Sequence, residues 1–445
     1  MNILQEFDTI TAPATPNGAG GVGVIRISGE KSFEIIKKIF SRENLEAGKI
    51  AHGWITDGKK KIDEVIVLPF KKPNSYTGED VIEIHCHGGL NVIRNILDLV
   101  KQNGARTAER GEFTKRAFLN KKMDLSQAEA VCDLIHAKTK NFARYSADNL
   151  SGILSQKIRE IRTLIFDLLS EIIAGIDFPE DVNEPEYSHI IIELGKVISN
   201  IDNILKNAQA SDILRQGVKI AIAGKPNAGK SSLFNSLLNR ERAIVTDIAG
   251  TTRDIIKENL DLDIAVTLID TAGIRDNHNN DKVEEIGIEY SKRSIEEADL
   301  ILFLYDISTG ITEEDKLILD LIKDKKYLLI ANKTDLPYKE KLENSVLISA
   351  KTGDGIEDLK SKIKDIVYNF SSEDIEFVTN ERQQDCLKKC RASLEQALSA
   401  AKCGELQDLI SIDLKTALLY LDEITGEVVT DEILNNIFNN FCIGK

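Results

Sequence analysis

The sequence is poor in the features that secreted and membrane proteins need. Its 445 residues contain six cysteines, too few and too scattered for a disulfide framework, which indicates a reducing compartment. The first residues show no basic segment followed by an apolar run, so we expect no secretory signal. The most apolar stretch, residues 164–176, is interrupted by Asp167 and Glu171, which argues against a bilayer span. We therefore expect a cytoplasmic protein with no membrane partner.

Positive charge is also scarce. The formal net charge is −15, whereas general nucleic-acid binders are usually basic. The deficit is uneven, because residues 1–123 hold 19 Lys and Arg against 15 Asp and Glu. Within them, residues 101–122 hold seven basic side chains and two acidic ones. This segment is either a solvated face or an anion-binding patch, and its composition leaves both open.

Residues 1–122 mix strand and helix patterns. The runs GVGVIRISG (residues 21–29) and EVIVLPF (residues 64–70) predict strands. Residues 90–104 predict a helix that ends at a glycine. An α+β domain follows from this pattern.

From Ser126 onward strand signals disappear for about 85 residues, as judged by pattern. The run SQAE (residues 126–129) predicts a capping box at a helix start. A helical apolar stripe follows, and two prolines in residues 178–186 end it. The stripe consists of Leu154, Ile158, Ile161, Ile165, Leu168, Ile172 and Ile176.

Residues 218–368 alternate between strand and helix patterns, as in a doubly wound α/β domain, and the chain is helical again after residue 377. The fold class is therefore multidomain, with an all-α domain into which an α/β domain is inserted. We expect an N-terminal domain at 1–122, helical segments at 123–213 and 377–445, and the inserted domain at 214–376.

The inserted domain starts with a phosphate-binding pattern. The run VKIAIAGKPNAGKSS (residues 218–232) is a strand, a G-x-x-x-x-G-K-S loop and a helix start. Gly224 and Gly229 allow backbone N–H groups to surround phosphates, Lys230 reaches the outer phosphates, and Ser231 ligates Mg²⁺.

Four further motifs follow in the order of a P-loop GTPase. Thr252 in AGTTRD offers a second Mg²⁺ hydroxyl, and DTAG begins with Asp270, an indirect Mg²⁺ partner. Asp335 in NKTD accepts the guanine N1–H and N2–H₂ groups, and Ser349 opens SAK, which closes over the guanine O6. ATP would leave a buried Asp335 unpaired, so the pattern predicts selectivity for GTP.

One position departs from signalling GTPases. Ile274 follows DTAG, where a water-orienting glutamine is usual. Asn227 is a candidate ligand for a monovalent cation in its place. A glutamate of residues 282–289 is a candidate for orienting the water, although an exposed helix start explains these glutamates more simply.

Two smaller features have more than one interpretation. His85 and His87 share a strand face, but without a second ligand pair they favour a binding-pocket wall over zinc. Cys442 is fourth from the end, but Ile443-Gly444-Lys445 fits a prenylation signal poorly. It is then either a small buried hydrophobe or a reactive thiol on a tail docked by Phe438 and Phe441.

Five stretches together resemble the MnmE (TrmE) family of tRNA-modification GTPases. They are PATPNGAGGVGVIRISG, NSYTGEDVIEIHCHGG, RGEFTKRAFLNKKMDLSQAEA, the inserted GTPase and the terminal FCIGK. The resemblance implies a homodimer, an N-terminal domain that binds a formyl- or methylene-tetrahydrofolate, and a flavoprotein partner, MnmG (GidA). It also implies that the two proteins modify carbon 5 of the wobble uridine of certain tRNAs.

The resemblance also implies site residues. GTP, with Mg²⁺ at Ser231 and Thr252, is assigned to Asn227, Ala228, Gly229, Lys230, Ser231, Ser232, Thr246, Asp247, Ile248, Ala249, Gly250, Thr251, Thr252, Asp270, Thr271, Ala272, Gly273, Asn332, Lys333, Asp335, Ser349, Ala350 and Lys351. Potassium is assigned to Asn227, Thr246, Ile248 and Thr251, and the folate to Arg26, Glu83, Lys122 and Lys445. The catalytic groups are Glu284, Asn227 and Cys442.

A GTPase that acts only as a ribosome-assembly or signalling switch is the alternative. It predicts no one-carbon chemistry and no need for Cys442.

Overall fold

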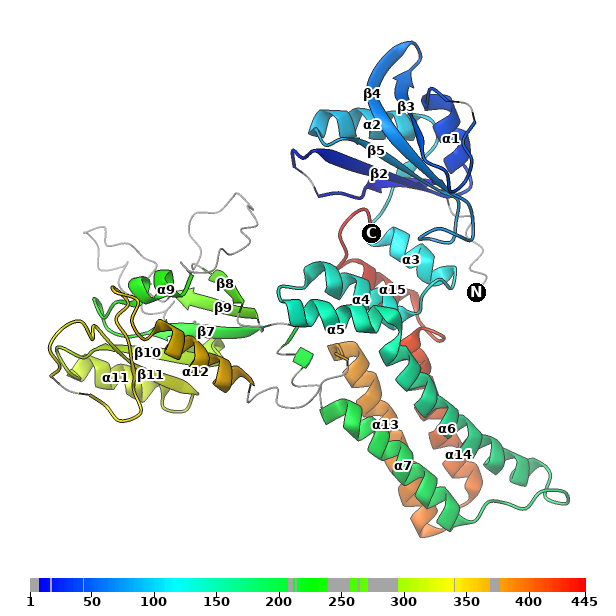
Figure 1. Ribbon diagram of the computed structural model, residues 1–445. Helices are drawn as coiled ribbons and strands as arrows, with labels where there is room; N and C mark the ends of the chain where they lie inside the picture. The colour runs from blue at the N-terminus through cyan, green and yellow to red at the C-terminus, as the bar shows by residue number, and fades with distance from the viewer. Residues whose placement is uncertain are drawn as a thin grey trace. The chain divides into compact units, whose positions relative to one another are not determined.

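A computed structural model describes residues 8–16, 18–42, 44–206, 211–212, 214–215, 217–238, 257–261, 265–270, 295–339, 341–368 and 377–445 (Figure 1). The chain forms two compact units. Unit 1 consists of Met1–Cys132, Ala147–Ile198 and Cys386–Lys445. Unit 2 consists of Asp133–Ser146 and Ser199–Asp385.

Unit 1 begins with a six-stranded sheet in the order β3-β4-β5-β2-β1-β6. All neighbouring strands are antiparallel except β1 and β6, which are parallel. The strands are β1 (Ile10–Pro13), β2 (Val22–Ser28), β3 (Ala51–Asp57), β4 (Lys60–Phe70), β5 (Val81–His87) and β6 (Arg106–Thr107).

Helices α1 (Ser32–Ile39) and α2 (Leu90–Gln102) pack on one face of this sheet (Figure 1). Alternation along the strands explains the packing, because Ile25, Ile27, Ile82 and Ile84 point into the core. Arg26 and Glu83 alternate with them and pair across β2 and β5, so they lie on the opposite face. The expected α+β pattern is confirmed, with both quoted strands and the helix present.

Before the inserted domain, the described residues also form α3 (Glu112–Leu119), α4 (Leu125–His136), α5 (Lys140–Ser151), α6 (Ile153–Asp177) and α7 (Tyr187–Lys206). Those after it are α13 (Glu381–Cys403), α14 (Gln407–Thr425) and α15 (Asp431–Phe438). Helices α6 and α14 lie side by side (Figure 1). The predicted stripe of α6 is buried from Leu154 to Ile172, and Ile176 is half-buried.

The capping box predicted at Ser126–Glu129 is wrong. Asp124 Oδ1 accepts from the Gln127 N–H at 3.0 Å, and Gln127 Oε1 accepts from the Asp124 N–H at 3.0 Å. Asp124 therefore caps α4 with its partner three residues on. Ser126 lies inside the helix, and its hydroxyl is 2.8 Å from that of Ser155.

Unit 2 contains a six-stranded sheet in the order β12-β11-β10-β7-β9-β8. Only β8 is antiparallel to its neighbour. Its strands are β7 (Val218–Ala223), β8 (Lys257–Asp261), β9 (Ala265–Asp270), β10 (Leu300–Asp306), β11 (Tyr327–Asn332) and β12 (Val346–Leu347).

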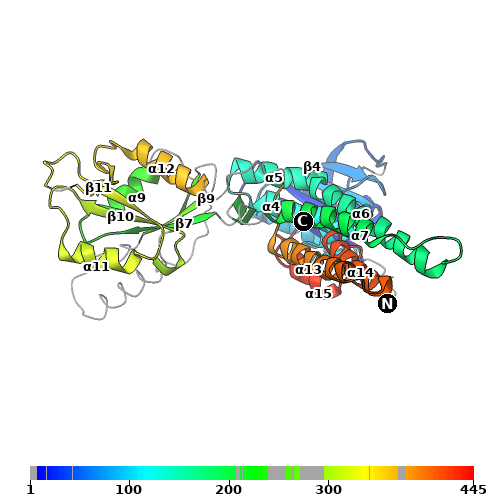
Figure 2. The same ribbon diagram turned by 90° about the horizontal axis from the view of Figure 1, so that it is seen from below.

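Helices cover both faces of this sheet. The helices α9 (Lys230–Leu238) and α12 (Ile356–Tyr368) lie on one face and α11 (Glu313–Ile322) on the other (Figure 2). All seven residues of β10 are buried, as expected for a central parallel strand. The predicted α/β fold is confirmed. No helix of the described residues is long and apolar enough to cross a bilayer.

Candidate functional site

The phosphate-binding pattern forms a tight loop between β7 and α9. Lys230 Nζ donates to the carbonyl oxygens of Gly224 at 2.8 Å and Lys225 at 3.0 Å, which holds the ammonium over the loop. Asn227 is exposed, with φ of 60°, and Gly229 has φ of 100°. Successive N–H groups in such left-handed turns make an anion-binding concavity. Ser231 and Ser232 are exposed in the first turn of α9.

Asn332 joins this loop to the expected base pocket. Its Nδ2 donates to the carbonyl of Ala228 at 2.8 Å, and its Oδ1 accepts from the Ala350 N–H at 3.0 Å. A Cβ added to Gly229 would lie 2.3 Å from Asn332 Nδ2, so only glycine fits there. One buried amide therefore brings together three motifs that are far apart in the sequence.

The base-pocket residues lie close to one another. Ser349 Oγ donates to Asp335 Oδ1 at 2.8 Å. Lys333 has φ of 67°, and its Nζ is 2.7 Å from Asp306 Oδ2. Burial would raise the pKa of Asp306, but hydrogen bonds from Lys333 and Ser308 outweigh burial and lower it. Asp335 and Lys351 are both exposed. The Asp335 carboxylate would therefore become buried only when a guanine base covers it.

Several predicted residues lie outside the described part of the chain: Thr246, Asp247, Ile248, Ala249, Gly250, Thr251, Thr252, Thr271, Ala272, Gly273 and Glu284. Asp270 is the last residue of β9, which pairs with β7. These assignments remain predictions.

A second cluster lies on the face of the unit 1 sheet opposite α1 and α2. Arg26 Nε donates to Glu83 Oε1 at 2.9 Å, and the Arg26 guanidinium lies over the rings of Tyr76 at 5.1 Å and Phe113 at 5.5 Å. His85 Nε2 is 3.5 Å from Glu83 Oε2. Two buried nitrogens, Arg26 Nη1 and His85 Nε2, have no hydrogen-bond partner among the described residues. Orphaned buried polar groups need an explanation, and a ligand with acceptor atoms fits these two.

Lys122 lies near this cluster in the loop that follows α3. Its Nζ donates to the carbonyl of Pro73 at 3.1 Å, and its stem lies against Gly78. Tyr76, which lies between Pro73 and Gly78 in the chain, covers Arg26. Arg26, Glu83 and Lys122 thus border one region of unit 1.

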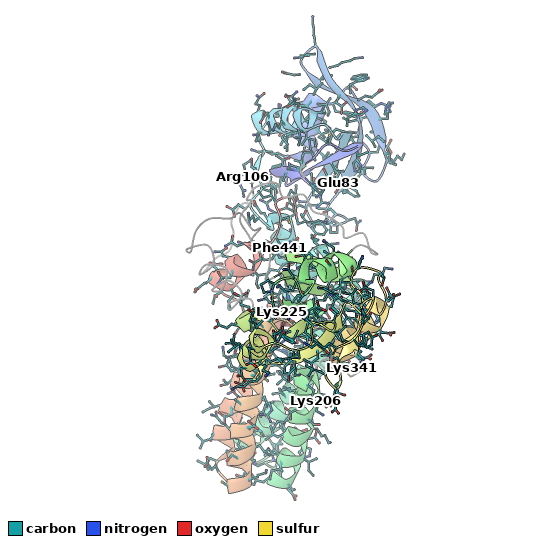
Figure 3. The ribbon with its side chains drawn as sticks, turned by 90° about the vertical axis from the view of Figure 1, so that its left-hand side faces the viewer. Glu83, Arg106, Lys206, Lys225, Lys341 and Phe441 are labelled. Atoms are coloured by element: carbon teal, nitrogen blue, oxygen red, sulfur yellow. The ribbon has the colours of Figure 1, made fainter. Side chains whose placement is uncertain are left out.

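The C-terminal segment docks onto the start of α3. Phe438 and Phe441 are 3% and 2% exposed, with ring centroids 5.3 Å apart. The Phe113 N–H donates to the Lys445 carbonyl at 3.2 Å, and Arg110 and Ile443 form an antiparallel bridge. Figure 3 shows Arg106 and Glu83 at the lower end of the N-terminal sheet in that view, with Phe441 below them. The prediction that both phenylalanines dock the tail is confirmed.

Cys442 is exposed on this docked tail, so its interpretation as a buried hydrophobe is wrong. Lys445 is half-buried, and burial together with the charge of Arg26 lowers its pKa, against smaller opposite effects of Glu83 and Cys442. The side chain of Lys445 therefore interacts electrostatically both with the sheet cluster and with Cys442.

A buried ion network that the sequence reasoning missed supports both the sheet cluster and the tail. Arg116 is 1% exposed, and it binds Glu112 at 2.9 Å and Glu79 at 3.2 Å. Arg106 also binds Glu112, at 2.7 Å. Burial would raise the pKa of Glu112, but hydrogen bonds from Arg106, the Glu109 N–H and Arg116 outweigh burial and lower it to about 2. The available signal was the Glu-x-x-x-Arg spacing of residues 112 and 116 on one helix face.

The basic segment 101–122 therefore divides into two groups. Arg106, which is itself exposed, and buried Arg116 both pair with Glu112, whereas Arg110, Lys121 and Lys122 are exposed and form no ion pair with another described residue. The HCH motif also divides, because His87 pairs with Asp63 at 2.7 Å while His85 faces Glu83. In the described residues no group of three His, Cys, Asp or Glu side chains is arranged to hold a metal ion.

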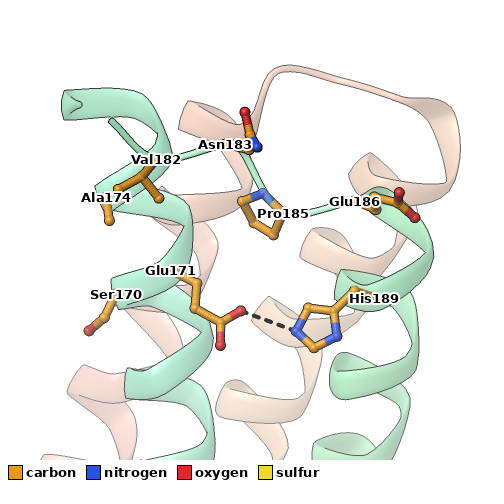
Figure 4. A pocket seen from close by; sticks show the side chains of 8 residues that line it. All are labelled: Ser170, Glu171, Ala174, Val182, Asn183, Pro185, Glu186 and His189. Carbon is orange, nitrogen blue, oxygen red and sulfur yellow. Dashed lines mark hydrogen bonds and ion pairs between the residues drawn. The ribbon is translucent and has the colours of Figure 1, made fainter. Parts of the chain in front are cut away.

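A cavity of about 620 Å³ lies where α6 and α7 are joined (Figure 4). Glu171 and His189 form an ion pair of 3.1 Å in its wall, and Pro185 and Glu186 line it. None of the residues predicted from the sequence lies there, so the cavity is separate from both candidate sites.

Comparisons with known proteins cover the whole chain. The family model described as "GTP-binding protein TrmE N-terminus" matches residues 9–122, and "MnmE helical domain" matches residues 125–442. A Thermotoga petrophila protein named "tRNA modification GTPase MnmE" is 43% identical over 99% of this chain and 100% of its own length. Its namesake from Clostridioides difficile is 45% identical over 98% of this chain and 99% of its own length.

Among solved structures, a variant of Aquifex aeolicus Era bound to GDP.AlF4- is 28% identical over 40% of this chain and 66% of its own. Its TM-score is 0.28. The two family models and the full-length relatives decide the family. The chain belongs to the MnmE family.

Proposed function

We propose that this protein is a potassium-stimulated GTP hydrolase that acts in tRNA modification. With a flavoprotein partner of the MnmG (GidA) type, its homodimer modifies carbon 5 of the wobble uridine of certain tRNAs. The one-carbon unit comes from a formyl- or methylene-tetrahydrofolate. Membership of the MnmE family supports the hydrolase and the tRNA class of substrate.

The GTP-binding residues fit a nucleotide. Lys230 and the N–H groups of Asn227–Gly229 would surround the phosphates, and Ser231, together with Thr252, would provide a hydroxyl to Mg²⁺. Asp335 would bind the guanine edge, and its contact with Ser349 and the bond from Ala350 to Asn332 support a base pocket formed with Lys333 and the 349–351 loop.

The hydrolysis step needs charge and a positioned water, because Ile274 has no hydrogen-bonding group. K⁺ held by Asn227, Thr246, Ile248 and Thr251 would neutralise charge that develops between the β- and γ-phosphates. Glu284 would orient the water. Apart from Asn227, these residues lie outside the described chain, so the assignments rest on the sequence.

The observation that supports the folate assignment is a pair of buried nitrogens without a hydrogen bond, Arg26 Nη1 and His85 Nε2, on the face of the sheet opposite α1 and α2. Glu83 offers carboxylate oxygens to the N–H groups of a pterin, and Lys122 and Lys445 offer charge to an anionic glutamate tail. When bound there, the reduced folate would supply a one-carbon unit. Tyr76 and Phe113 exclude water from one side of the guanidinium.

Cys442 is the proposed reactive group of the modification. It is exposed, and it is carried by a segment that both phenylalanines and the Phe113–Lys445 hydrogen bond hold against α3. A thiol in this setting would serve as a nucleophile or an acid–base group, and Lys445 nearby would help to hold the cofactor.

Titration with 5-formyltetrahydrofolate tests the proposal. Arg26→Ala and Glu83→Ala should lose folate binding and keep GTP hydrolysis near normal, because the two sites lie in different units. Lys61→Ala, which removes an exposed cation of the same sheet, is the matched control. Wild-type folate affinity in both site variants would remove the folate from the proposed function.

A further inference from the structure

The residues around Cys442 form a surface of cationic and amide side chains. It comprises Arg110, which precedes α3, Lys115 of α3, Asn435 and Asn436 of α15, Asn439 and Asn440 after its end, and Ile443. We propose that this tail surface binds the unpaired loop of an RNA substrate and brings a base to Cys442. The inference rests on the proposed function, and it names the residues that position the RNA.

The two cations of the tail surface are held in place without being neutralised. Arg110 Nη1 donates to the Asn439 carbonyl at 3.4 Å, and Lys115 Nζ donates to Asn435 Oδ1 at 3.4 Å. Both acceptors are uncharged, and neither cation forms an ion pair with a carboxylate of the described residues. Arg106 and Arg116 of the same segment bind Glu112 instead. The tail surface therefore keeps two positive charges for an anionic partner.

Three exposed carboxylates, Glu109, Asp431 and Glu432, border the tail surface. Glu109 is exposed and precedes Arg110 in the chain, and its backbone N–H binds Glu112. Asp431 and Glu432 lie in the first turn of α15, at the opposite end of the helix from Asn439 and Asn440. In a chain of net charge −15, two cations that form no ion pair with a described residue give an RNA backbone a local point of attachment on this surface.

The asparagines give the tail surface its second property. Leu434 and Phe438 bury one side of α15, and Asn435, Asn436 and Asn439 are exposed on the other. An amide carries both donors and an acceptor, so it reads the edge of an unpaired base, which a lysine cannot do. Ile443 is 53% exposed beside Cys442 and offers an apolar contact to a base.

Amides and cations together favour RNA over an acidic protein. Phosphate contacts from Arg110 and Lys115 hold a strand in register, and contacts to base edges select among loops. An acidic peptide would engage the cations and leave the row of amides unused. A paired RNA stem presents phosphates but hides its base edges, so the two kinds of side chain are separable by experiment.

Fluorescence anisotropy of a labelled stem–loop RNA, with a uridine-containing loop, on the full-length protein is the test. A fully paired RNA of equal length is the second probe. Arg110→Gln/Lys115→Gln should weaken binding of both RNAs by about tenfold and reduce the slope of log Kd against log salt by about 0.7 for each lost single-strand phosphate contact. Asn436→Ala/Asn439→Ala leaves the Asn435 acceptor of Lys115 in place, so it should weaken only the stem–loop and remove the preference for unpaired bases.

The matched control removes the same charge elsewhere. Lys37→Gln/Lys60→Gln changes two exposed lysines of the same unit that lie on α1 and β4. It should bind both RNAs as the wild type does. Arg110→Lys keeps the charge, so it should retain the binding and the salt slope that Arg110→Gln loses.

Three results would overturn the inference: no stem–loop binding by the wild type, an unchanged salt slope in Arg110→Gln/Lys115→Gln, or an equal loss in the control. GTP hydrolysis and folate titration without RNA are measured on the same samples. Their failure would contradict the proposed function, whereas the failure of RNA binding alone contradicts only this surface.

Discussion

The phosphate-binding loop of unit 2 and the tail site of unit 1 are built in opposite ways. The loop uses the backbone of Gly224–Ser231, a short continuous stretch shaped by two glycines. The tail site is the sheet cluster together with the docked C-terminal segment. Its residues Arg26, Glu83 and Lys445 come from two strands and the end of the chain. Its geometry therefore depends on the docking of segments far apart in sequence, whereas the geometry of the loop depends mainly on local conformation.

The difference predicts where remote substitutions act. A change in the packing of α3 or of the tail should alter the sheet cluster of unit 1 while the nucleotide loop keeps its shape.

Glu112→Gln should destabilise unit 1 by about 3 kcal/mol, because it removes a buried charge that pairs with Arg106 and Arg116. The pKa of Glu112 is lowered from 4.5 to about 2, so its contribution is present above pH 4.5 and is lost as the pH falls toward 2. Denaturant unfolding between these pH values should show this loss in the wild type and not in the variant. Glu30→Gln, an exposed control, should behave as the wild type. Equal pH dependence of wild type and Glu112→Gln would contradict the network.

Asp335→Asn should weaken GTP on the order of a hundredfold, since an amide presents the wrong hydrogen-bonding pattern to guanine. The variant should accept xanthosine triphosphate, whose C2 oxygen replaces the N2 donor. Titration of both nucleotides measures the exchange, and folate binding is the control in unit 1. Unchanged GTP affinity would mean that the base pocket is misassigned.

Gly444→Ala should undock the tail at a cost of about 2 kcal/mol. The residue has φ of 99°, and a Cβ there would lie 2.0 Å from the Pro13 carbonyl oxygen. Gly404→Ala is the control, because its φ is 68° and nothing lies within 4 Å of its Cβ. Folate affinity should fall in Gly444→Ala only, and GTP hydrolysis should fall in neither. A comparable loss in both would assign the effect to backbone strain alone.

Replacing potassium by sodium should slow GTP hydrolysis by about tenfold and leave folate binding unchanged. A cation of the right size at Asn227 is expected to stabilise charge that develops in the transition state, and Ile274 cannot. Steady-state phosphate release in the two salts at one ionic strength decides it. Equal rates would remove potassium from the proposal.

The contrast between the two sites also explains what could be predicted from the sequence. The nucleotide loop, β7 and α9 follow from the G-x-x-x-x-G-K-S pattern, because local glycines and a flanking apolar strand determine them. The hydrogen bonds of the Asn332 side chain with Ala228 and Ala350 were not predicted. The NKTD sequence alone does not determine which distant backbone groups this side-chain amide contacts.

In unit 1 less could be predicted. The alternation in β2 and β5 indicates strands, but only their register places Arg26 opposite Glu83. The inward turn of Arg116 depends on Glu79 and Glu112 together, and the start of α4 depends on the side chain of Asp124. Pairing between distant segments depends on tertiary structure, so composition and periodicity do not predict it.

We propose that the docked tail brings the reactive thiol of Cys442 to the sheet cluster of unit 1. The most direct test uses cells in which the only copy of this protein is the Cys442→Ser variant. Mass spectrometry of the wobble uridine in their tRNA measures the modification. We expect the modification to be absent while GTP hydrolysis and folate affinity of the purified variant equal those of the wild type. Modification at the wild-type level would contradict the claim and leave the tail with docking as its only role.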